Sequence, residues 1–159
     1  MPAKETTRET CPAPDSGIDL GILPELVGYH LRKAQVAVFQ DFARSVGTAE
    51  ISPGQFAVLM VIERNPGLSQ TRLGQTLGID RSTLVAVIDR LEARGLVARA
   101  DAPRDRRSYA LHVSDKGRAR LAELTERVRF HERQIAAGLD AAERASLIAL
   151  LRRIGRPAA

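Results

Sequence analysis

The chain has 159 residues, the length of one domain or of one domain with extensions. Apolar residues make up 44% and charged residues 27%, as in ordinary globular proteins, and no run of 18 apolar residues predicts a membrane-spanning helix. The net charge is +5, with 21 Arg against 3 Lys. Such a charge favours an acidic partner such as nucleic acid, although a compositional bias toward Arg explains it equally well.

The first 17 residues are polar and contain Pro, so they predict a flexible tail and no secretory signal. Cys11, in this tail, is the only cysteine and excludes an intrachain disulfide. A single cysteine fits a reducing compartment, and we expect a cytoplasmic protein. Cys11 has no obvious neighbour that would activate its thiol, so the sequence favours an inert residue over a redox sensor.

A long helix is predicted from about Leu20 to Val46, because apolar residues recur there at spacings of three and four. These residues are Leu23, Val27, Leu31, Ala34, Val38 and Phe42. The stripe is widened by Leu26, Val36 and Phe39, so we expect this helix to be buried against more than one neighbour.

Three shorter helices follow, each with a capping signal. The run Ser52-Pro53-Gly54-Gln55 is a capping box with Pro at the first helical position, and it opens a helix to about residue 63. Ser69 caps a helix through Leu77, which Gly78 ends. Asp80 caps the next helix, over about 81–94, which Gly95 ends.

Two short strands are predicted at 96–100 and 108–113, with a loop over 101–107. Helices at about 115–138 and from 141 onward complete the order. Three compact helices and a hairpin predict a winged helix-turn-helix, so the fold class is mainly α with a small β-hairpin wing. The apolar helices at both ends of the chain are expected to pair with each other and with a second copy. The expected divisions are a tail at 1–17, a dimerisation region at 18–47 and 115–159, and a DNA-binding domain at 48–114.

The helix at 81–94 has one apolar and one polar face at 100° per residue. The predicted core residues are Leu84, Val87, Ile88 and Leu91, and the predicted exposed residues are Ser82, Ala86, Asp89 and Ala93. The exposed face is small and polar at its start, which suits a major groove, and free N–H groups there would attract phosphate. Asp89 argues weakly for an ordinary solvated helix, because a carboxylate repels phosphate.

The loop after this helix has three arginines near its tip, where burial is not expected. Arginines on such a loop can enter a minor groove. The predicted DNA-binding residues are Ser69, Gln70, Thr71, Arg81, Ser82, Thr83, Arg90, Arg104, Asp105, Arg106 and Arg107. Arg94 and Arg99 are equally compatible with phosphate contacts and with surface ion pairs.

Residues 51–118 resemble the MarR family of bacterial transcriptional regulators. The matching runs are SPGQFAVLMVIERNPGLSQTRLGQTLGIDRSTLVAVIDRLEARGLVAR and PRDRRSYALHVSDKGR. The family's wing signature is Asp-x-Arg, five residues, an aliphatic residue, then Thr or Ser, which Asp105, Arg107, Val113 and Ser114 satisfy.

The resemblance implies a homodimer that binds a pseudo-palindromic operator, usually as a repressor. It places Ser82 and Thr83 at the start of the recognition helix and makes Arg107 the minor-groove arginine. Arg106 is its neighbour, and Asp105 is the acid that orients the wing.

Many members of this family release DNA when a small ligand, often an aromatic acid, binds. In this chain Tyr29, His30 and Arg32 are candidate residues for an aromatic acid, and a coenzyme A thioester is a second possible effector. The alternative for each residue alone is slightly favoured: His30 is a hydrogen-bonded core residue, and Arg32 is solvated.

Other classes of function have less support. A winged-helix module that binds an acidic protein is an alternative, as is a redox-responsive regulator. The chain has no P-loop, dinucleotide fingerprint or nucleophile motif, so we expect no enzyme and no cofactor. The histidines at 30, 112 and 131 lack the spacing of metal ligands, so no metal site is expected.

Overall fold

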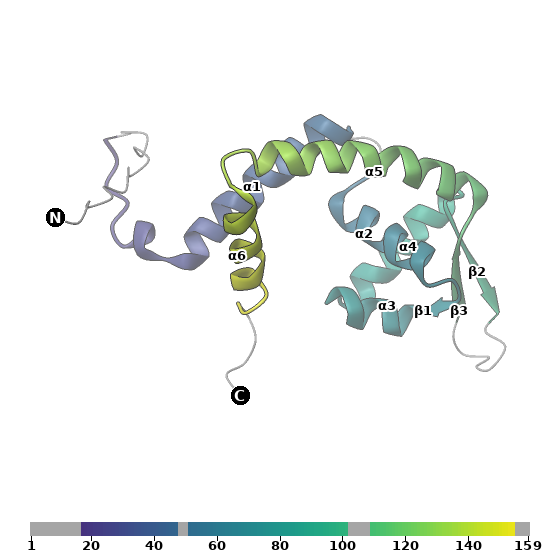
Figure 1. The fold of residues 1–159 in the computed structure, drawn as a ribbon. Helices are drawn as coiled ribbons and strands as arrows, with labels where there is room; N and C mark the ends of the chain where they lie inside the picture. The colour runs from purple at the N-terminus through teal and green to yellow at the C-terminus, as the bar shows by residue number, and fades with distance from the viewer. Residues whose placement is uncertain (1–16, 48–50, 102–108, 155–159) are drawn as a thin grey trace. The chain divides into compact units, whose positions relative to one another are not determined.

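The computed structural model describes residues 17–47, 51–101 and 109–154 (Figure 1). The chain divides into two compact units, residues 1–35 and 36–159, and the division falls inside the first long helix. None of the helices in the described ranges is long and apolar enough to span a membrane.

The first unit begins with a short 3-10 helix, η1, at Leu23–Glu25, and continues into helix α1, Val27–Val46. The expected continuous helix from Leu20 is therefore wrong at its start. Gly21 has a left-handed backbone with φ of +54°, Pro24 is the second residue of the 3-10 helix, and Leu26 is extended. Because the backbones of Gly21 and Leu26 are incompatible with one α-helix, α1 starts only after Leu26.

The second unit contains the C-terminal part of α1 and all remaining elements. These are α2 (Pro53–Arg64), β1 (Leu68–Ser69), α3 (Gln70–Leu77), α4 (Arg81–Ala93), β2 (Val97–Asp101), β3 (Tyr109–Val113), α5 (Asp115–Ile135) and α6 (Ala141–Leu151). The capping box at Ser52 and Gln55 is present, as are the caps at Ser69, Asp80 and Ser114 and the capping box at Asp140. The helix starts expected from the sequence are therefore confirmed for α2 to α6.

The three strands form one antiparallel sheet with the order β1-β3-β2. Val97 pairs with Val113 and Asp101 with Tyr109, so β2 and β3 make the expected hairpin. The two-residue strand β1 pairs Leu68 with Leu111, and the sequence analysis missed it. Helices α2, α3 and α4 pack together beside this sheet (Figure 1), which gives the topology of a winged helix-turn-helix.

The core of this unit is aliphatic and continuous. Its fully buried side chains include Val58, Leu59, Ile62, Leu73, Ile88, Leu91, Leu111 and Leu124. Helix α5 contributes Leu121 and Leu124, so its first half packs with α2, α3, α4 and the sheet. We call these elements together the winged body. At its N-terminus Gly117 lies against Leu96, just before β2, and against Val113 of β3, where a β-carbon would overlap the carbonyl oxygen of Leu96 and come within 2.6 Å of Val113 Cγ1.

Farther along α5, a buried polar pair joins this helix to the second half of α1. His131 is 1% exposed, and its Nδ1 lies 2.7 Å from Asp41 Oδ2. Phe42 packs edge-on against the His131 ring, with 5.4 Å between the ring centroids. The hydrogen bond with His131 lowers the pKa of Asp41, so this carboxylate is ionised at neutral pH.

Candidate nucleic-acid interface and ligand pockets

Helix α4 has the two faces that the sequence predicts. Leu84, Ile88 and Leu91 are buried, and Val87 is half-buried. The opposite residues, Ser82, Ala86, Asp89 and Ala93, are all exposed. The helix packs closely on α3, because a β-carbon on Gly74 would lie 3.3 Å from Leu84 Cδ2 of α4 and 3.1 Å from Ile79 O in the turn between them. The outer face of α4 is therefore narrow, small and held rigidly.

The first turn of α4 is organised by its cap. The Asp80 carboxylate accepts the backbone N–H of Thr83 at 2.9 Å and the hydroxyl of Ser82 at 2.6 Å. The hydrogen bond from Ser82, with those from Thr83, holds the pKa of Asp80 well below its usual range. A carboxylate at this end also favours the helix dipole.

This cap engages one of the N–H groups that were expected to be free at the start of α4, since Asp80 accepts the Thr83 N–H. The Asp80 carboxylate also places a negative charge beside this end of the helix. Arg81, Ser82 and Thr83 are all exposed, and Ser82 presents acceptor lone pairs while its proton points to Asp80.

Helix α3 places the other predicted contacts at its start. Ser69 is both the last residue of β1 and the N-cap of α3, where its hydroxyl accepts the Arg72 N–H. Gln70 is half-buried and Thr71 is exposed. The four wing residues expected to contact DNA all lie outside the described residues. They are Arg104, Asp105, Arg106 and Arg107.

The second half of α4 is tied to the wing by one arginine. Arg99 of β2 donates to Asp89 Oδ1 at 2.5 Å and also to Glu92, and its side chain is 19% exposed. Partial burial disfavours the charged guanidinium, but the two carboxylates outweigh this effect and raise the pKa of Arg99. Of the two alternatives for Arg99, the structure shows the ion pair.

This ion pair also reduces the repulsion that Asp89 would exert on phosphate. From the sequence alone, Asp89 is an unpaired carboxylate on the surface that would face DNA. In the structure Arg99 compensates its charge, so Asp89 is less repulsive to phosphate than its position suggests. Arg90, from the same turn, is exposed on the flank of the helix.

The three candidate ligand residues lie in the first unit. The rings of Tyr29 and His30 meet edge-on with centroids 5.4 Å apart, and His30 Nε2 lies 2.8 Å from Pro24 O. Arg32 donates to Gln35 at 3.1 Å, while Lys33 lies 5.4 Å from the Tyr29 ring centroid. His30 is hydrogen-bonded, as the alternative interpretation expected, but it is exposed in the single chain.

A pocket that the sequence analysis missed lies within the second unit. It has a volume of about 380 Å³, and Phe56, Thr125, Val128, Arg129, Glu132, Arg133 and Arg144 line it. Its lining comes from α2, α5 and α6, so no local pattern in the sequence could reveal it. Arg129 pairs with Glu126 at 2.7 Å and Arg144 with Glu132 at 3.5 Å. Arg133 lies 5.9 Å from the Phe130 ring centroid and has no carboxylate partner among the described residues.

These features define a winged helix-turn-helix protein whose α4 has an exposed polar face and which has a separate pocket between α2, α5 and α6. Comparison with known proteins is consistent with this class. Residues 50–108 match the model of the MarR family. A transcriptional regulatory protein for the hcr operon of Thauera aromatica is 43% identical over 82% of this chain and 79% of its own.

Two solved structures of a transcriptional repressor, CouR, are also similar. CouR bound to a 23-mer DNA duplex is 43% identical, with a TM-score of 0.81 over 87% of this chain and 99% of that one. CouR bound to p-coumaroyl-CoA is 39% identical, with a TM-score of 0.81 over 89% of this chain and 99% of that one. The protein therefore belongs to the MarR family of transcriptional regulators.

Proposed function

We propose that the protein is a dimeric, cytoplasmic transcriptional repressor without enzymatic activity, which binds a pseudo-palindromic operator and leaves it when an effector binds. The exposed face of α4, opposite its buried leucines, is the observation that carries this proposal. Arg81, Ser82 and Thr83 would read the major groove from this face. Contacts to the phosphates would come from Ser69, Gln70, Thr71 and Arg90. The proposed minor-groove contacts come from the wing residues Arg104, Asp105, Arg106 and Arg107.

Repression is supported by the resemblance to CouR, which is named a repressor and was solved on DNA. Two features of the structure hold the recognition helix α4 in place. Gly74 allows α3 and α4 to cross closely, and Arg99 holds the far end of α4 to the sheet. Both ends of α4 are therefore held in place, as is required of a helix that contacts base edges in a DNA groove.

We propose an aromatic acid or its coenzyme A thioester as the class of effector. The pocket between α2, α5 and α6 supports this choice, because Phe56 and Val128 supply an apolar wall and Arg133 supplies a cation for a carboxylate or carbonyl oxygen. Tyr29, His30 and Arg32 are proposed separately as candidate ligand-binding residues of the first unit. CouR was solved with p-coumaroyl-CoA, which makes this thioester the first probe to test.

The test begins with selection of duplexes from a random DNA pool by the purified dimer. We expect enrichment of an inverted repeat, binding that weakens steeply with salt, and release by p-coumaroyl-CoA or p-coumarate. Arg133→Met should reduce the response to the effector about tenfold without changing DNA affinity, because one charge-assisted contact is lost. Arg64→Met, an exposed change at the end of α2, is the matched control. Failure to enrich any sequence would contradict the proposed function.

A further inference from the structure

Strand β3 begins with an aromatic side chain that the core of the chain does not cover. Tyr109, its first residue, is 52% exposed, whereas Leu111, two residues later, is fully buried. Alternate residues of a strand lie on the same face of a sheet, so both side chains belong to the face that packs on the helices. The core therefore ends between these two residues, and within the described ranges the Tyr109 hydroxyl has no hydrogen-bond partner.

Strand pairing places Tyr109 next to the start of α3. Ser69, the N-cap of α3, pairs with Ala110 in the sheet. One more step of this ladder would set Gln70 opposite Tyr109, but Gln70 is already the first residue of the helix. The backbone of Tyr109 therefore lies beside the segment Ser69-Gln70-Thr71, from which we propose phosphate contacts.

The same face of the sheet also meets α4. Arg99 lies directly opposite Leu111, and opposite residues share a face, so Arg99 and Tyr109 project from the same side of the sheet. The Arg99 guanidinium lies 2.5 Å from Asp89 Oδ1, on the exposed side of α4. Two residues of extended strand span about 7 Å, so Tyr109 is the next residue of β3 on this face in the direction of the wing.

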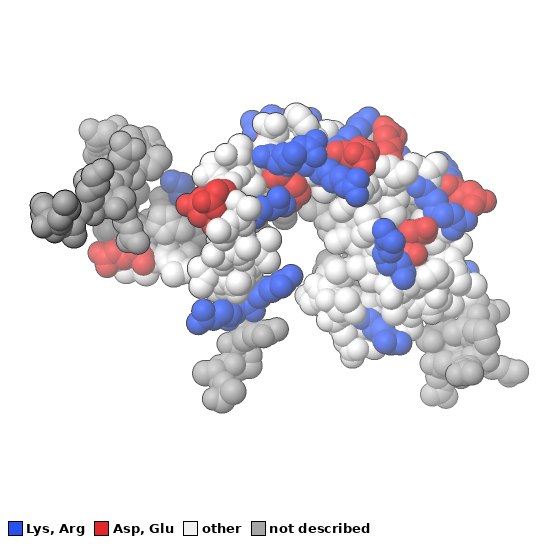
Figure 2. All heavy atoms as spheres, viewed as in Figure 1, with Lys and Arg blue, Asp and Glu red and all other residues white. Residues whose placement is uncertain are grey.

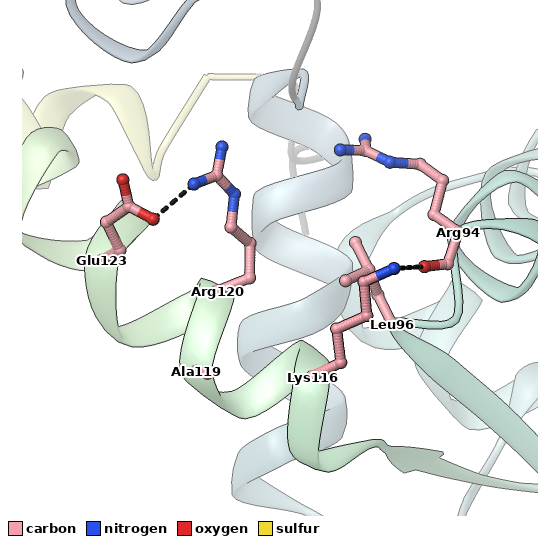
Figure 3. A pocket seen from close by; sticks show the side chains of 6 residues that line it. All are labelled: Arg94, Leu96, Lys116, Ala119, Arg120 and Glu123. Carbon is pink, nitrogen blue, oxygen red and sulfur yellow. Dashed lines mark hydrogen bonds and ion pairs between the residues drawn. The ribbon is translucent and has the colours of Figure 1, made fainter.

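The hairpin that carries Tyr109 is anchored at its base. Lys116 Nζ donates to the carbonyl oxygen of Arg94 at 2.9 Å, which ties the first turn of α5 to the end of α4 (Figure 3). Ser114 Oγ donates to the carbonyl oxygen of Gly95 at 2.6 Å, just before the chain enters β2. These bonds hold the two strands in place relative to α4, so Tyr109 would meet a bound duplex without prior ordering of its strand.

The surface near the start of β3 has few charges of its own. Figure 2 shows charged side chains gathered along α5, whereas the visible surface of α3 and the sheet carries few of them. Contacts with phosphates in this region therefore depend more on uncharged donors than on cations. Tyrosine, serine and threonine hydroxyls are common partners of DNA phosphates.

We propose that Tyr109 contacts the backbone of the operator DNA between the recognition helix and the wing. Its hydroxyl donates to a phosphate oxygen and its ring packs against the neighbouring deoxyribose, because a tyrosine side chain combines an apolar ring with a polar tip. Such a contact carries no sequence information, but it fixes the register and orientation of α4 on the duplex. The proposal rests on the DNA-binding mode proposed above and adds a residue that the sequence analysis did not select.

Fluorescence anisotropy of the full-length dimer tests the hydroxyl. Tyr109→Phe should weaken binding of the selected duplex about tenfold, because each of the two chains loses one hydrogen bond to a phosphate. A scrambled duplex of equal length should lose affinity by the same factor, since its backbone is the same. A tyrosine hydroxyl neutralises no phosphate charge, so the slope of affinity against salt concentration should not change.

Thr76→Val is the matched control for the lost hydroxyl. Thr76 is exposed on α3, but its hydroxyl donates to Arg72 O at 2.8 Å within the same helix. The substitution removes a hydroxyl and keeps the shape of the side chain, so the affinity for DNA should stay unchanged.

Fluorine NMR tests the proximity of Tyr109 to DNA directly. Incorporation of 3-fluorotyrosine labels two positions, since the chain has two tyrosines, and Tyr29→Phe leaves Tyr109 as the single label. We expect the Tyr109 resonance to shift when the selected duplex is added and to return when high salt releases the DNA.

The proposal stands if this resonance shifts and Tyr109→Phe weakens binding of both duplexes equally. It is overturned if Tyr109→Phe binds like the wild type, if Thr76→Val loses as much affinity, or if the resonance does not move. A loss confined to the selected duplex would also overturn it, because Tyr109 would then read bases. In these cases the wild-type protein still binds the selected duplex, so the proposed function survives, whereas a failure to bind any duplex would end both.

Discussion

The winged body and helix α6 contrast in how they use their apolar residues. In the winged body the large side chains of α2, α4 and β3 are buried within the chain itself, as Leu59, Ile88 and Leu111 show. None of the residues of α6 is buried, although the helix is mostly apolar. Its Leu147 is 44% exposed and its Leu150 is 54% exposed.

The contrast shows which apolar surfaces the single chain covers with its own residues and which it leaves exposed. A helix with several half-exposed leucines on one side is stable only if another surface covers them. The winged body needs no such cover, because its helices and sheet share one core. The recognition helix is thus built by the chain alone, whereas its spacing from a second recognition helix depends on the association of two chains.

The largest effect should come from placing charge on the apolar side of α6. Leu147→Asp with Leu151→Asp should raise the dissociation constant of the dimer by a factor on the order of 100 or more, because each leucine contributes about 1.5–3 kcal/mol when buried. Sedimentation velocity over a concentration series measures the change. Ala149→Asp, on the opposite side of α6 at 100° per residue, is the control. A double variant that remains a stable dimer would remove α6 from the interface.

Gly117→Ala tests the winged body itself. Its added methyl group would overlap the carbonyl oxygen of Leu96, so the start of α5 would have to move away from Leu96 and Val113. We expect a loss of about 3 kcal/mol in the free energy of unfolding, at the upper end of the range for overpacked cores. Denaturant unfolding gives this value.

The control for this substitution is Gly138→Ala, where an added β-carbon meets nothing within 4 Å. It should change the free energy of unfolding by less than about 1 kcal/mol. Equal losses at the two glycines would show that the start of α5 does not pack against Leu96 and Val113 as closely as the structure has it.

Arg99 lies within the winged body, on the surface that we propose meets DNA. Arg99→Met uncovers the carboxylates of Asp89 and Glu92, and we expect about a tenfold loss of DNA affinity. Adding Asp89→Asn and Glu92→Gln to this variant should restore most of the affinity. Fluorescence anisotropy with the selected duplex measures both steps. No recovery would mean that Arg99 itself contacts DNA.

The smallest effect concerns the pair that joins α1 to α5. His131 lowers the pKa of Asp41 below 3.8, so folding releases a proton from Asp41 at acid pH. The stability that this carboxylate contributes is present above about pH 4 and is lost as the pH falls through its lower folded-state pKa. The difference in melting temperature between wild type and Asp41→Asn should therefore narrow between pH 5 and pH 2.5. A constant difference would contradict the pairing with His131.

The sequence predicts α4 well because its information is local. Its cap, its buried leucines and its exposed face all follow from spacings within one helix, and the structure has each of them. The start of α1 is different, because apolar spacing continues through Leu23 and Leu26 while the backbones of Gly21 and Leu26 are not helical. Periodicity alone therefore overestimated that helix.

The features that the sequence missed depend on residues far apart in the chain. Strand β1 has only two residues and is defined by its pairing with Leu111 and Ala110. The pocket near Phe56 needs Arg133 and Arg144 from later helices. The partners of Arg99 are Asp89, ten residues earlier, and Glu92, seven residues earlier, across a turn whose geometry no spacing rule gives.

The most direct test of the central claim is the salt dependence of binding to the selected duplex. An operator contacted by both chains through six or more phosphates should lose about 10³-fold in affinity as salt rises from about 50 mM to 200 mM. A scrambled duplex of equal length should bind more weakly at every salt concentration. If the affinity falls less than about tenfold over this range, or if the scrambled duplex binds equally well, α4 does not read DNA as proposed.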